Sequence, residues 1–432
     1  MEQFIAVFFG LAAGIVTGVL PGAGVTVAMI VATPLLLGFD VIQLLLFYMS
    51  LASMVQFTGT IPAVYLGIPG ETNSLPAVIE GTKFNRHSNG KLAIGISALG
   101  SVFGSMIAVL LTVCIVGLLA SHVSFFFSNN VKFYLYLFVI LFCLYVYNKN
   151  NFFINAGLCL IGFMLSLPGE NNLNTEPRYT FGFEDMEYGI PLISVLIGFL
   201  VVPTLYKMYK DSYTRQVAKE STTSFKKVLI YYFRRCIPSS LRGSVIGYLC
   251  GFVPGVSTVL STNTPTSPAK MLVASETANN SGQFASMLPL LLIGIPITGS
   301  EVVLYSMLVD AGWSPFQFDN VTNNVDMIFK QIVPWFVFAN IVGLVVAWPM
   351  AKHVLKILSI SKIFVVAILG IFVLLLNTYL GMQDYRVIFY TMCLIVFGCI
   401  GILFKKYETV PLIFMFILGN DIEAVFVRQF IT

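Results

Sequence analysis

Four glycine–proline breakers interrupt strongly apolar stretches of this chain, and they come in two pairs. The first pair lies at Pro21-Gly22 and at 66–70, and the second lies at Pro254-Gly255 and at 293–299. A helix broken inside a hydrocarbon phase exposes backbone N–H and C=O groups at several kcal/mol each, unless these groups line a cavity or meet a ligand. Paired interruptions at matching places in two halves of a chain are typical of the binding sites of secondary transporters.

The composition restricts the fold class. Hydrophobic residues make up 57% of the 432 residues and charged residues only 10%, whereas soluble domains carry about 25% charged residues. Apolar runs of about twenty residues recur, which indicates helices rather than the alternating runs of about ten that a transmembrane barrel needs. We therefore predict an all-α polytopic protein of the cell inner (cytoplasmic) membrane, with about 10–12 transmembrane segments. The weak net charge of +4 does not indicate a nucleic-acid partner.

Charged loops alternate in sign along the chain. Basic residues gather at 83–91, 207–242, 352–362 and 405–406, and acidic residues dominate 170–187 and 310–326. By the positive-inside rule, the basic loops are cytoplasmic and the acidic loops are external. The apolar segments between them are expected to cross the membrane near 92–119, 131–147, 151–168 and 189–209, and again near 328–350, 362–378, 387–404 and 409–426.

These two sets of crossings run in opposite directions, which predicts two inverted-topology repeats. The first repeat covers 1–210 and the second covers 241–432. The basic linker between them, 211–240, contains an amphipathic part near 225–233 that is expected to lie on the cytoplasmic surface. The alternative is two unrelated halves whose Pro-Gly motifs match by coincidence.

The breakers also predict where a ligand binds. Proline stops a helix, glycine permits positive φ, and the half-helix that follows presents N–H groups that bind anions. No basic residue follows Val256 before Lys270, so helix dipoles and Ser, Thr and Asn side chains are expected to hold an anionic substrate. Each of these side chains could instead cap a helix end. The candidate substrate-binding residues are Gly22, Gly24, Thr26, Thr58, Gly70, Asn73, Ser74, Gly255, Ser257, Thr258, Asn279, Asn280, Thr298, Gly299 and Ser300.

Two acidic residues are candidates for coupling transport to an ion gradient. Glu71 follows a breaker, where it could instead cap a helix N-terminus. Glu301 lies in an apolar run, where it could carry a proton, coordinate Na⁺ or be satisfied by neighbouring hydroxyl groups. Glu80 and Asp310 lie near loop edges and are expected to be solvated. No cofactor and no metal site are expected, apart from Na⁺ as a candidate coupling ion.

The same residues carry a resemblance to a known family. The motifs of the first half are Gly14-x3-Gly18-x2-Pro21-Gly22-Ala23-Gly24, Leu66-Gly67-Ile68-Pro69-Gly70-Glu71, Gly90-Lys91-Leu92-Ala93-Ile94-Gly95 and Glu176-Pro177-Arg178-Tyr179-Thr180-Phe181-Gly182. Those of the second half are Arg242-Gly243, Pro254-Gly255, Ser275-Glu276-x2-Asn279-Asn280 and Leu292-Ile293-Gly294-Ile295-Pro296. From about residue 4 to 425, the chain resembles the large membrane subunit of tripartite tricarboxylate transporters, the TctA family.

The resemblance implies symport of small organic carboxylates of the tricarboxylate and dicarboxylate class into the cell, driven by a Na⁺ or proton gradient. It implies a small membrane subunit and a periplasmic solute-binding protein as partners, besides membrane lipids, and leaves a homo-oligomer open. Three positions depart from the family pattern: Ser257 replaces a glycine, Ile297 replaces another, and Glu301 stands at a small or hydroxyl position. An added carboxylate at a carboxylate site argues against assuming citrate.

Parts of the sequence also suggest two other classes of protein. An intramembrane enzyme is disfavoured, because no histidine lies at membrane depth to activate Ser257 and Asp421 has no obvious paired aspartate. We therefore expect no enzymatic activity. An ion or anion channel with the same broken helices is the main alternative, and it differs from a carrier in its higher flux and its inability to accumulate substrate.

Overall fold

The computed structural model describes thirteen parts of the chain, which are 2–20, 24–67, 74–119, 129–148, 151–170, 177–210, 223–251, 256–262, 265, 267–294, 296–313, 328–357 and 362–431. In these parts the chain is helical apart from turns, and an isolated bridge pairs Gly169 with Arg178. The predicted all-α class is confirmed.

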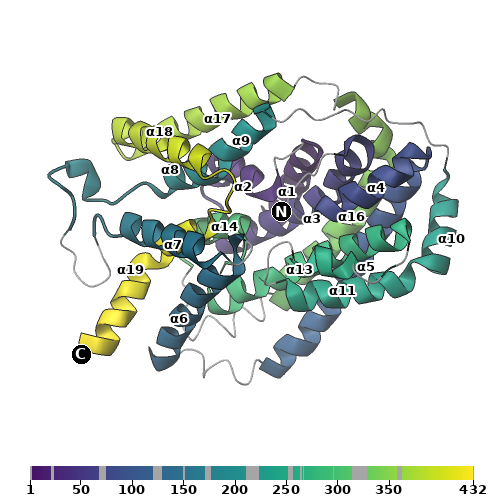
Figure 1. Cartoon of the computed structure of the whole chain (residues 1–432), viewed down its shortest axis with the longest axis horizontal. Helices are drawn as coiled ribbons and strands as arrows, with labels where there is room; N and C mark the ends of the chain where they lie inside the picture. Colours follow the sequence, from purple (N-terminus) through teal and green to yellow (C-terminus); the bar gives the residue numbers. More distant parts are fainter. Residues whose placement is uncertain are drawn as a thin grey trace. The chain divides into compact units, whose positions relative to one another are not determined.

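Helices α1 to α9 belong to the first half of the sequence (Figure 1). They are α1 (Glu2–Val19), α2 (Gly24–Leu36), α3 (Val41–Leu66), α4 (Leu75–Arg86), α5 (Gly90–Leu119), α6 (Asn129–Val146), α7 (Phe152–Ser166), a 3-10 turn (Glu184–Met186), α8 (Leu192–Leu196), the π-helical η5 (Ile197–Val201) and α9 (Val202–Lys210). The second half contains α10 (Phe225–Arg235), α11 (Ile237–Cys250), α12 (Val256–Thr262), α13 (Pro268–Ile293), α14 (Gly299–Asp310), the π-helical η6 (Ile328–Ile332), α16 (Val333–Ile357), α17 (Lys362–Gln383), α18 (Val387–Leu403) and α19 (Val410–Ile431).

Helices cover the eight segments that the sequence predicts to cross the membrane. The described residues include 7 helices long and apolar enough to span a membrane, and four shorter apolar ones at Gly24–Leu36, Tyr136–Tyr145, Phe152–Ser166 and Val387–Leu403. Large apolar side chains such as Phe153 (85% exposed) and Leu403 (78%) lie on the outer faces of these helices, as hydrocarbon contact requires. The chain is a polytopic membrane protein.

The chain forms two compact units, and each draws helices from both halves of the sequence. Unit 1 consists of Met1–Ser121 and Asp211–Lys362, which hold α1–α5 and α10–α16. Unit 2 consists of His122–Lys210 and Ile363–Thr432, which hold α6–α9 and α17–α19. Every described candidate site residue lies in unit 1.

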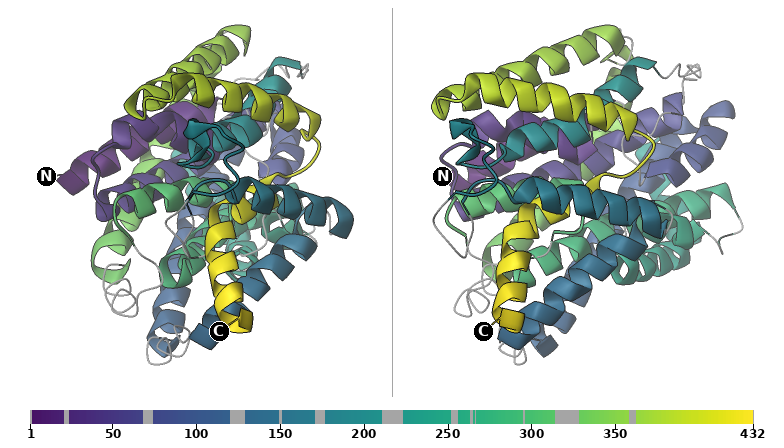
Figure 2. Two further views of the ribbon diagram at one scale, coloured as in Figure 1. Left: turned by 90° about the vertical axis from the view of Figure 1, so that its left-hand side faces the viewer. Right: turned by 60° about the vertical axis from the view of Figure 1, so that its left-hand side comes forward.

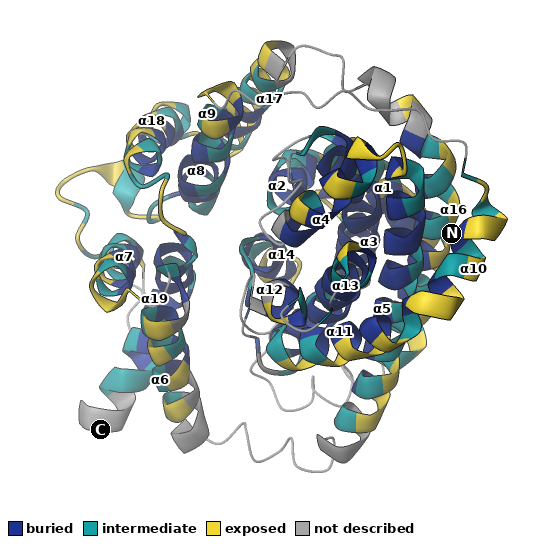
Figure 3. Ribbon diagram, turned by 45° about the vertical axis from the view of Figure 1, so that its right-hand side comes forward, coloured by how far each residue is buried: buried dark blue, intermediate teal, exposed yellow. Residues whose placement is uncertain are grey.

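Two helices of 26 residues, α3 and α13, form the centre of unit 1, where Figure 3 shows them mostly buried. Both contain a proline four positions before their last residue, Pro62 in α3 and Pro289 in α13. Both end on a glycine in the left-handed region, Gly67 and Gly294, each with φ 70. Glycine adopts this conformation without the steric penalty of a Cβ atom, so the two breakers end their helices in the same way.

A glycine-bearing helix packs along each of these central helices. Cβ atoms at the three spaced glycines of α1 would overlap the carbonyl groups of Phe47, Leu51 and Val55 in α3. Those of α11 would overlap the carbonyl groups of Ala274, Ala278 and Gly282 in α13. The glycines are Gly10, Gly14 and Gly18 in α1, and Gly243 and Gly247 in α11 with its C-cap Gly251. The numbering rises together in each pair, so each pair runs parallel with backbones in close approach.

The remaining helices of unit 1 pack against the two central helices. Gly100 and Gly104 of α5 lie against Val273 and Thr277 of α13, while α16 packs on α3. The predicted amphipathic segment is helix α10, whose Val228 and Tyr232 are buried in a cluster with Ala93 of α5.

Unit 2 also combines helices from both halves of the sequence. Helix α19 lies beside α6 and α7, as Figure 2 shows, and α18 packs on α8, η5 and α9. Two arginines hold its loops in place: Arg178 pairs with Glu423 of α19, and Arg386 donates to the carbonyl of Asp185 at 2.9 Å. On another side, Asn148 accepts from the backbone N–H of Glu408 at 2.7 Å.

Candidate functional site

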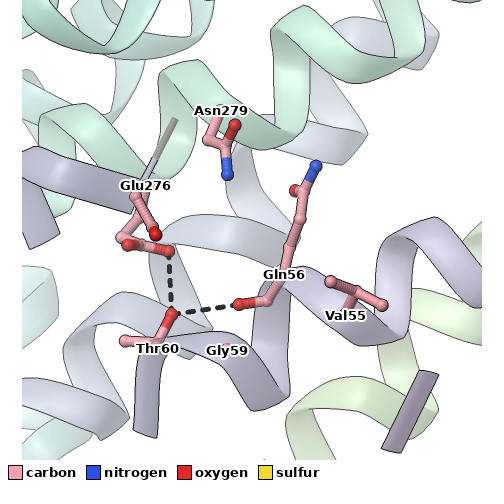
Figure 4. Close-up of a pocket in the computed structure, with 7 residues that line it drawn as sticks. Val55, Gln56, Gly59, Thr60, Glu276 and Asn279 are labelled. Carbon is pink, nitrogen blue, oxygen red and sulfur yellow. Dashed lines mark hydrogen bonds between the residues drawn. The ribbon is translucent and has the colours of Figure 1, made fainter. Parts of the chain in front are cut away.

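A small cavity lies inside unit 1, where α3 crosses α13 (Figure 4). Its lining comprises Val55, Gln56, Gly59, Thr60, Ser74, Glu276 and Asn279. The space open to the centre of a water molecule is ≈ 10 Å³, which is about what a single water or ion needs. No lysine or arginine is among these lining residues.

The carboxyl group of Glu276 is the only charged group among the lining residues. Glu276 is 3% exposed, and the hydroxyl of Thr60 lies 3.1 Å from its Oε2. The same hydroxyl lies 3.0 Å from the backbone carbonyl of Gln56, one turn earlier in α3. Because a hydroxyl has one proton, Thr60 can donate fully to only one of these two acceptors.

Gln56 joins the two central helices. Its side-chain NH₂ donates to Oε1 of Gln283 in α13. Its own Oε1 is buried and has no hydrogen-bond partner among the described residues. Most buried polar atoms in proteins are paired, so an orphaned acceptor in a cavity that also holds a carboxylate needs an explanation.

Of the predicted site residues, the structure brings Ser74 and Asn279 to this cavity, and both are buried. Ser74 is the N-cap of α4, although its side chain makes no capping bond to that helix. Sequence reasoning did not select Gln56, Thr60 or Glu276. The signal for Glu276 was present, because an acid at i with amides at i+3 and i+4 shares one face of an apolar helix.

Four other predicted residues form the N-terminus of α14 rather than the cavity. Thr298 is the N-cap, and Gly299, Ser300 and Glu301 are the first helical residues. The Glu301 carboxylate accepts from the N–H groups of Ile297 at 2.7 Å and Thr298 at 3.0 Å. It also accepts from the Ser286 hydroxyl of α13 at 2.6 Å. Together with the bond from Glu301 N to the Thr298 hydroxyl, this is a capping box that also ties α14 to α13.

The other described candidates are dispersed. Thr58 donates to the carbonyl of Gly14 at 2.9 Å and so joins α3 to α1. Asn280 donates to the carbonyl of Glu276 at 2.9 Å, inside its own helix. Ser257 and Thr258 are buried at the start of α12, Gly24 begins α2, and Thr26 is half-buried. Gly22, Gly70, Glu71, Asn73 and Gly255 lie outside the described residues.

The expectation that Glu80 is solvated was wrong. Glu80 is 3% exposed, and both carboxylate oxygens lie 2.8 Å from Nζ of Lys83, one turn later. Helix α4 is packed against α3, α5 and α13, so a residue close to a loop in sequence is enclosed in space. Asp310, at the end of α14, is exposed as expected.

The sequence matches the model of the tripartite tricarboxylate transporter TctA family over residues 4–416. The chain belongs to this family. An uncharacterised 52.8 kDa protein of the TAR-I ttuC′ 3′ region of Agrobacterium vitis is 25% identical over 445 positions, which cover 96% of this chain and 84% of that relative. No solved structure matches the chain.

Membership of the TctA family makes the chain a tricarboxylate-transporter component, and the predicted resemblance is confirmed. It is a multi-pass membrane protein of a transport family, and that family belongs to tripartite systems, which have further subunits.

Proposed function

We propose that this TctA protein is a secondary active transporter that imports small organic carboxylates, driven by a Na⁺ or proton gradient. The observation that carries the proposal is the family match over 4–416, nearly the whole chain. The buried polar groups of unit 1 support it, because Thr60 lies near the end of α3 and Ser300 and Glu301 follow the end of α13. These helix ends are the kind of backbone interruption at which carriers bind their substrates.

We propose further that the substrate is held by neutral polar groups and helix N-termini. The lining of the cavity offers hydroxyl and amide groups and no lysine or arginine. The N-terminus of α14 is less suited to a substrate carboxylate than the sequence suggested, because Glu301 already engages the N–H groups of Ile297 and Thr298. Of the described candidates, Ser74 and Asn279 lie outside that capping box, at a cavity that is itself too small to enclose a carboxylate.

The proposed inverted repeats are supported by the register of the two central helices. If Gly67 is aligned with Gly294, Pro62 matches Pro289 and Gln56 matches Gln283. These two equivalent glutamines contact each other, as expected for residues beside a pseudo-twofold axis. The numbering rises in α3 and falls in α13 between the contacts Gln56–Gln283 and Thr60–Glu276, so the helices cross with opposite directions.

Contacts between turns support the proposed membrane topology. The turn before α18 and the loop 177–190 are both predicted to be external, and Arg386 joins them through the carbonyls of Asp185 and Gly189. The turns before α7 and α19 are both predicted to be cytoplasmic, and Asn148 joins them through Glu408. In unit 1, Lys91 lies 4.7 Å from the ring of Trp348, near the cytoplasmic linker helix α10.

Uptake by purified full-length protein in liposomes tests the transport proposal. Labelled mono-, di- and tricarboxylates are offered under an inward Na⁺ gradient, an inward proton gradient or neither, with and without the proposed small subunit and solute-binding protein. We expect accumulation above the bath concentration for one class of carboxylate, and collapse of that accumulation with an ionophore. Flux that only equilibrates the substrate would favour the channel alternative instead.

Single cysteines test the topology. Asn89→Cys and Arg234→Cys should be protected from a membrane-impermeant maleimide in intact cells, whereas Glu184→Cys should be labelled above the background of the native cysteines. All three positions are exposed, so labelling reports the side of the membrane rather than burial. Labelling that placed Asn89→Cys and Arg234→Cys on opposite sides of the membrane would remove the proposed inversion.

A further inference from the structure

The cavity at the crossing of α3 and α13 brings several oxygen atoms together, beside the hydroxyl of Ser74 and the amide of Asn279. Its acceptors include the carboxylate of Glu276, Oε1 of Gln56 and the carbonyl of Gln56. The proton of the Thr60 hydroxyl serves either the carbonyl at 3.0 Å or the carboxylate at 3.1 Å, and not both fully. Such an arrangement of oxygen atoms attracts a cation.

The orphaned Oε1 of Gln56 distinguishes between two cations. A proton on Glu276 would neutralise the carboxylate, and the O–H group so formed could donate to one acceptor only, either Oε1 of Gln56 or the hydroxyl of Thr60. A metal ion in the cavity would meet both the carboxylate and the amide oxygen. Gln56 is only 5% exposed and its NH₂ group donates to Gln283, and in Figure 4 its side chain extends along the cavity toward Asn279, on the side opposite Glu276.

Size and charge then select the kind of metal ion. A space of ≈ 10 Å³ admits a single ion and excludes a carboxylate substrate. Within the described part of the chain, no three His, Cys, Asp or Glu side chains gather at one place, so one carboxylate must balance the charge. A single negative charge among hard oxygen donors suits a monovalent ion better than a divalent one.

We propose that Glu276, Gln56 and Thr60 form a Na⁺ site, with Ser74 and Asn279 as its walls. The site deepens the proposed function, on which it rests for the role of the ion: Na⁺ bound here is the ion that drives import. Binding of Na⁺ joins α3 to α13, and both helices end in the breakers that flank the proposed substrate site. The occupancy of the ion site is thereby linked to the position of those helix ends.

Among the described residues, the equivalent crossing of the matching helices does not repeat this site. With Gly67 aligned to Gly294, the positions equivalent to Glu276, Thr60 and Asn279 are Met49, Met287 and Ala52. These apolar residues offer no ligand to Na⁺. Substitutions at Met49 and Met287 should therefore leave Na⁺ binding unchanged, and these two positions serve as matched controls.

Binding of radiolabelled Na⁺ to the purified full-length protein, measured without any carboxylate, tests the site. We expect saturable binding of a single ion that excess unlabelled Na⁺ displaces and choline does not. Glu276→Gln should weaken this binding by at least about tenfold, because it removes the charge-assisted contact. Gln56→Leu should also weaken it, and Met49→Leu should leave it unchanged.

Thermal unfolding of each variant shows whether it is folded, and Glu276→Asp keeps the charge should Glu276→Gln fail to fold. Glu276→Asp should retain Na⁺ binding at reduced affinity. Absence of saturable Na⁺ binding to the folded wild-type protein, or wild-type affinity in Glu276→Gln, would overturn the site. Failure of carboxylate uptake in liposomes, with Na⁺ binding intact, would instead count against the proposed transport function.

Discussion

When Gly67 is aligned with Gly294, α3 and α13 agree in length, in the position of their proline and in the carbonyl groups that face the glycines of α1 and α11. They disagree in the side chains at their crossing. The α13 position at Glu276 corresponds to Met49, and the α3 position at Thr60 corresponds to Met287. The backbone arrangement is thus repeated, whereas the chemistry is not. Packing therefore fixes what both helix pairs share, and the ion site depends on residues that only one crossing carries.

The largest expected effect concerns the shared packing. Gly14→Leu and Gly247→Leu should each prevent the close approach of a helix pair, because the added side chain meets backbone atoms that cannot move aside. Overpacking costs about 1–3 kcal/mol where a core can adjust, and here more is expected. The measurement is the yield of monodisperse protein and its unfolding temperature.

Gly370→Leu is the control for these two variants, because nothing lies within 4 Å of a Cβ atom at that helical position. Its yield and unfolding temperature should stay close to those of the wild type. A lower yield or unfolding temperature for Gly14→Leu, with wild-type values for Gly247→Leu, would show that the two helix pairs are not packed alike.

The features that sequence could predict are the local ones. Hydropathy located the helices. Proline and glycine end a helix within a few residues of their own position, as Gly67 and Gly294 do here. The Na⁺ site is different, because Thr60 and Glu276 are separated by 216 positions and meet only where two helices cross. No local pattern contains that crossing. The misplacement of Glu80 has the same origin, since its burial depends on the packing of α4 against α3.

The next largest effect should separate Thr60 from its equivalent, Met287. Thr60→Val removes the hydroxyl that faces Glu276 and should weaken Na⁺ binding by about tenfold, since a hydrogen bond to a charged group is worth about 1.5–3 kcal/mol. Met287→Leu should leave Na⁺ binding unchanged. Thr60→Ser restores the hydroxyl and should restore most of the affinity. Equal losses in Thr60→Val and Met287→Leu would show that the two crossings do not differ as proposed.

A smaller effect should separate the adjacent residues Asn279 and Asn280. Asn279 lines the cavity, whereas Asn280 bonds to a carbonyl of its own helix. Asn279→Ala should lower Na⁺ affinity or carboxylate affinity by several-fold. Asn280→Ala should cost about 0.5–1.5 kcal/mol of stability and leave both affinities near the wild-type values. A larger loss of affinity in Asn280→Ala than in Asn279→Ala would reassign the face of α13 that meets the ligand.

The smallest effect is expected at Glu301, and it contrasts the N-termini of α4 and α14. The N-terminus of α14 is closed by a capping box, whereas the N-cap of α4, Ser74, makes no capping bond and lines the cavity. Glutamine also serves at the third position of a capping box, so Glu301→Gln should retain the fold with a loss of about 1 kcal/mol. If Glu301 is only a cap, the initial uptake rates of wild type and Glu301→Gln should have superimposable pH profiles at fixed Na⁺ and superimposable Na⁺ profiles at fixed pH. A shifted profile in the same liposomes would instead make Glu301 a second coupling residue besides Glu276.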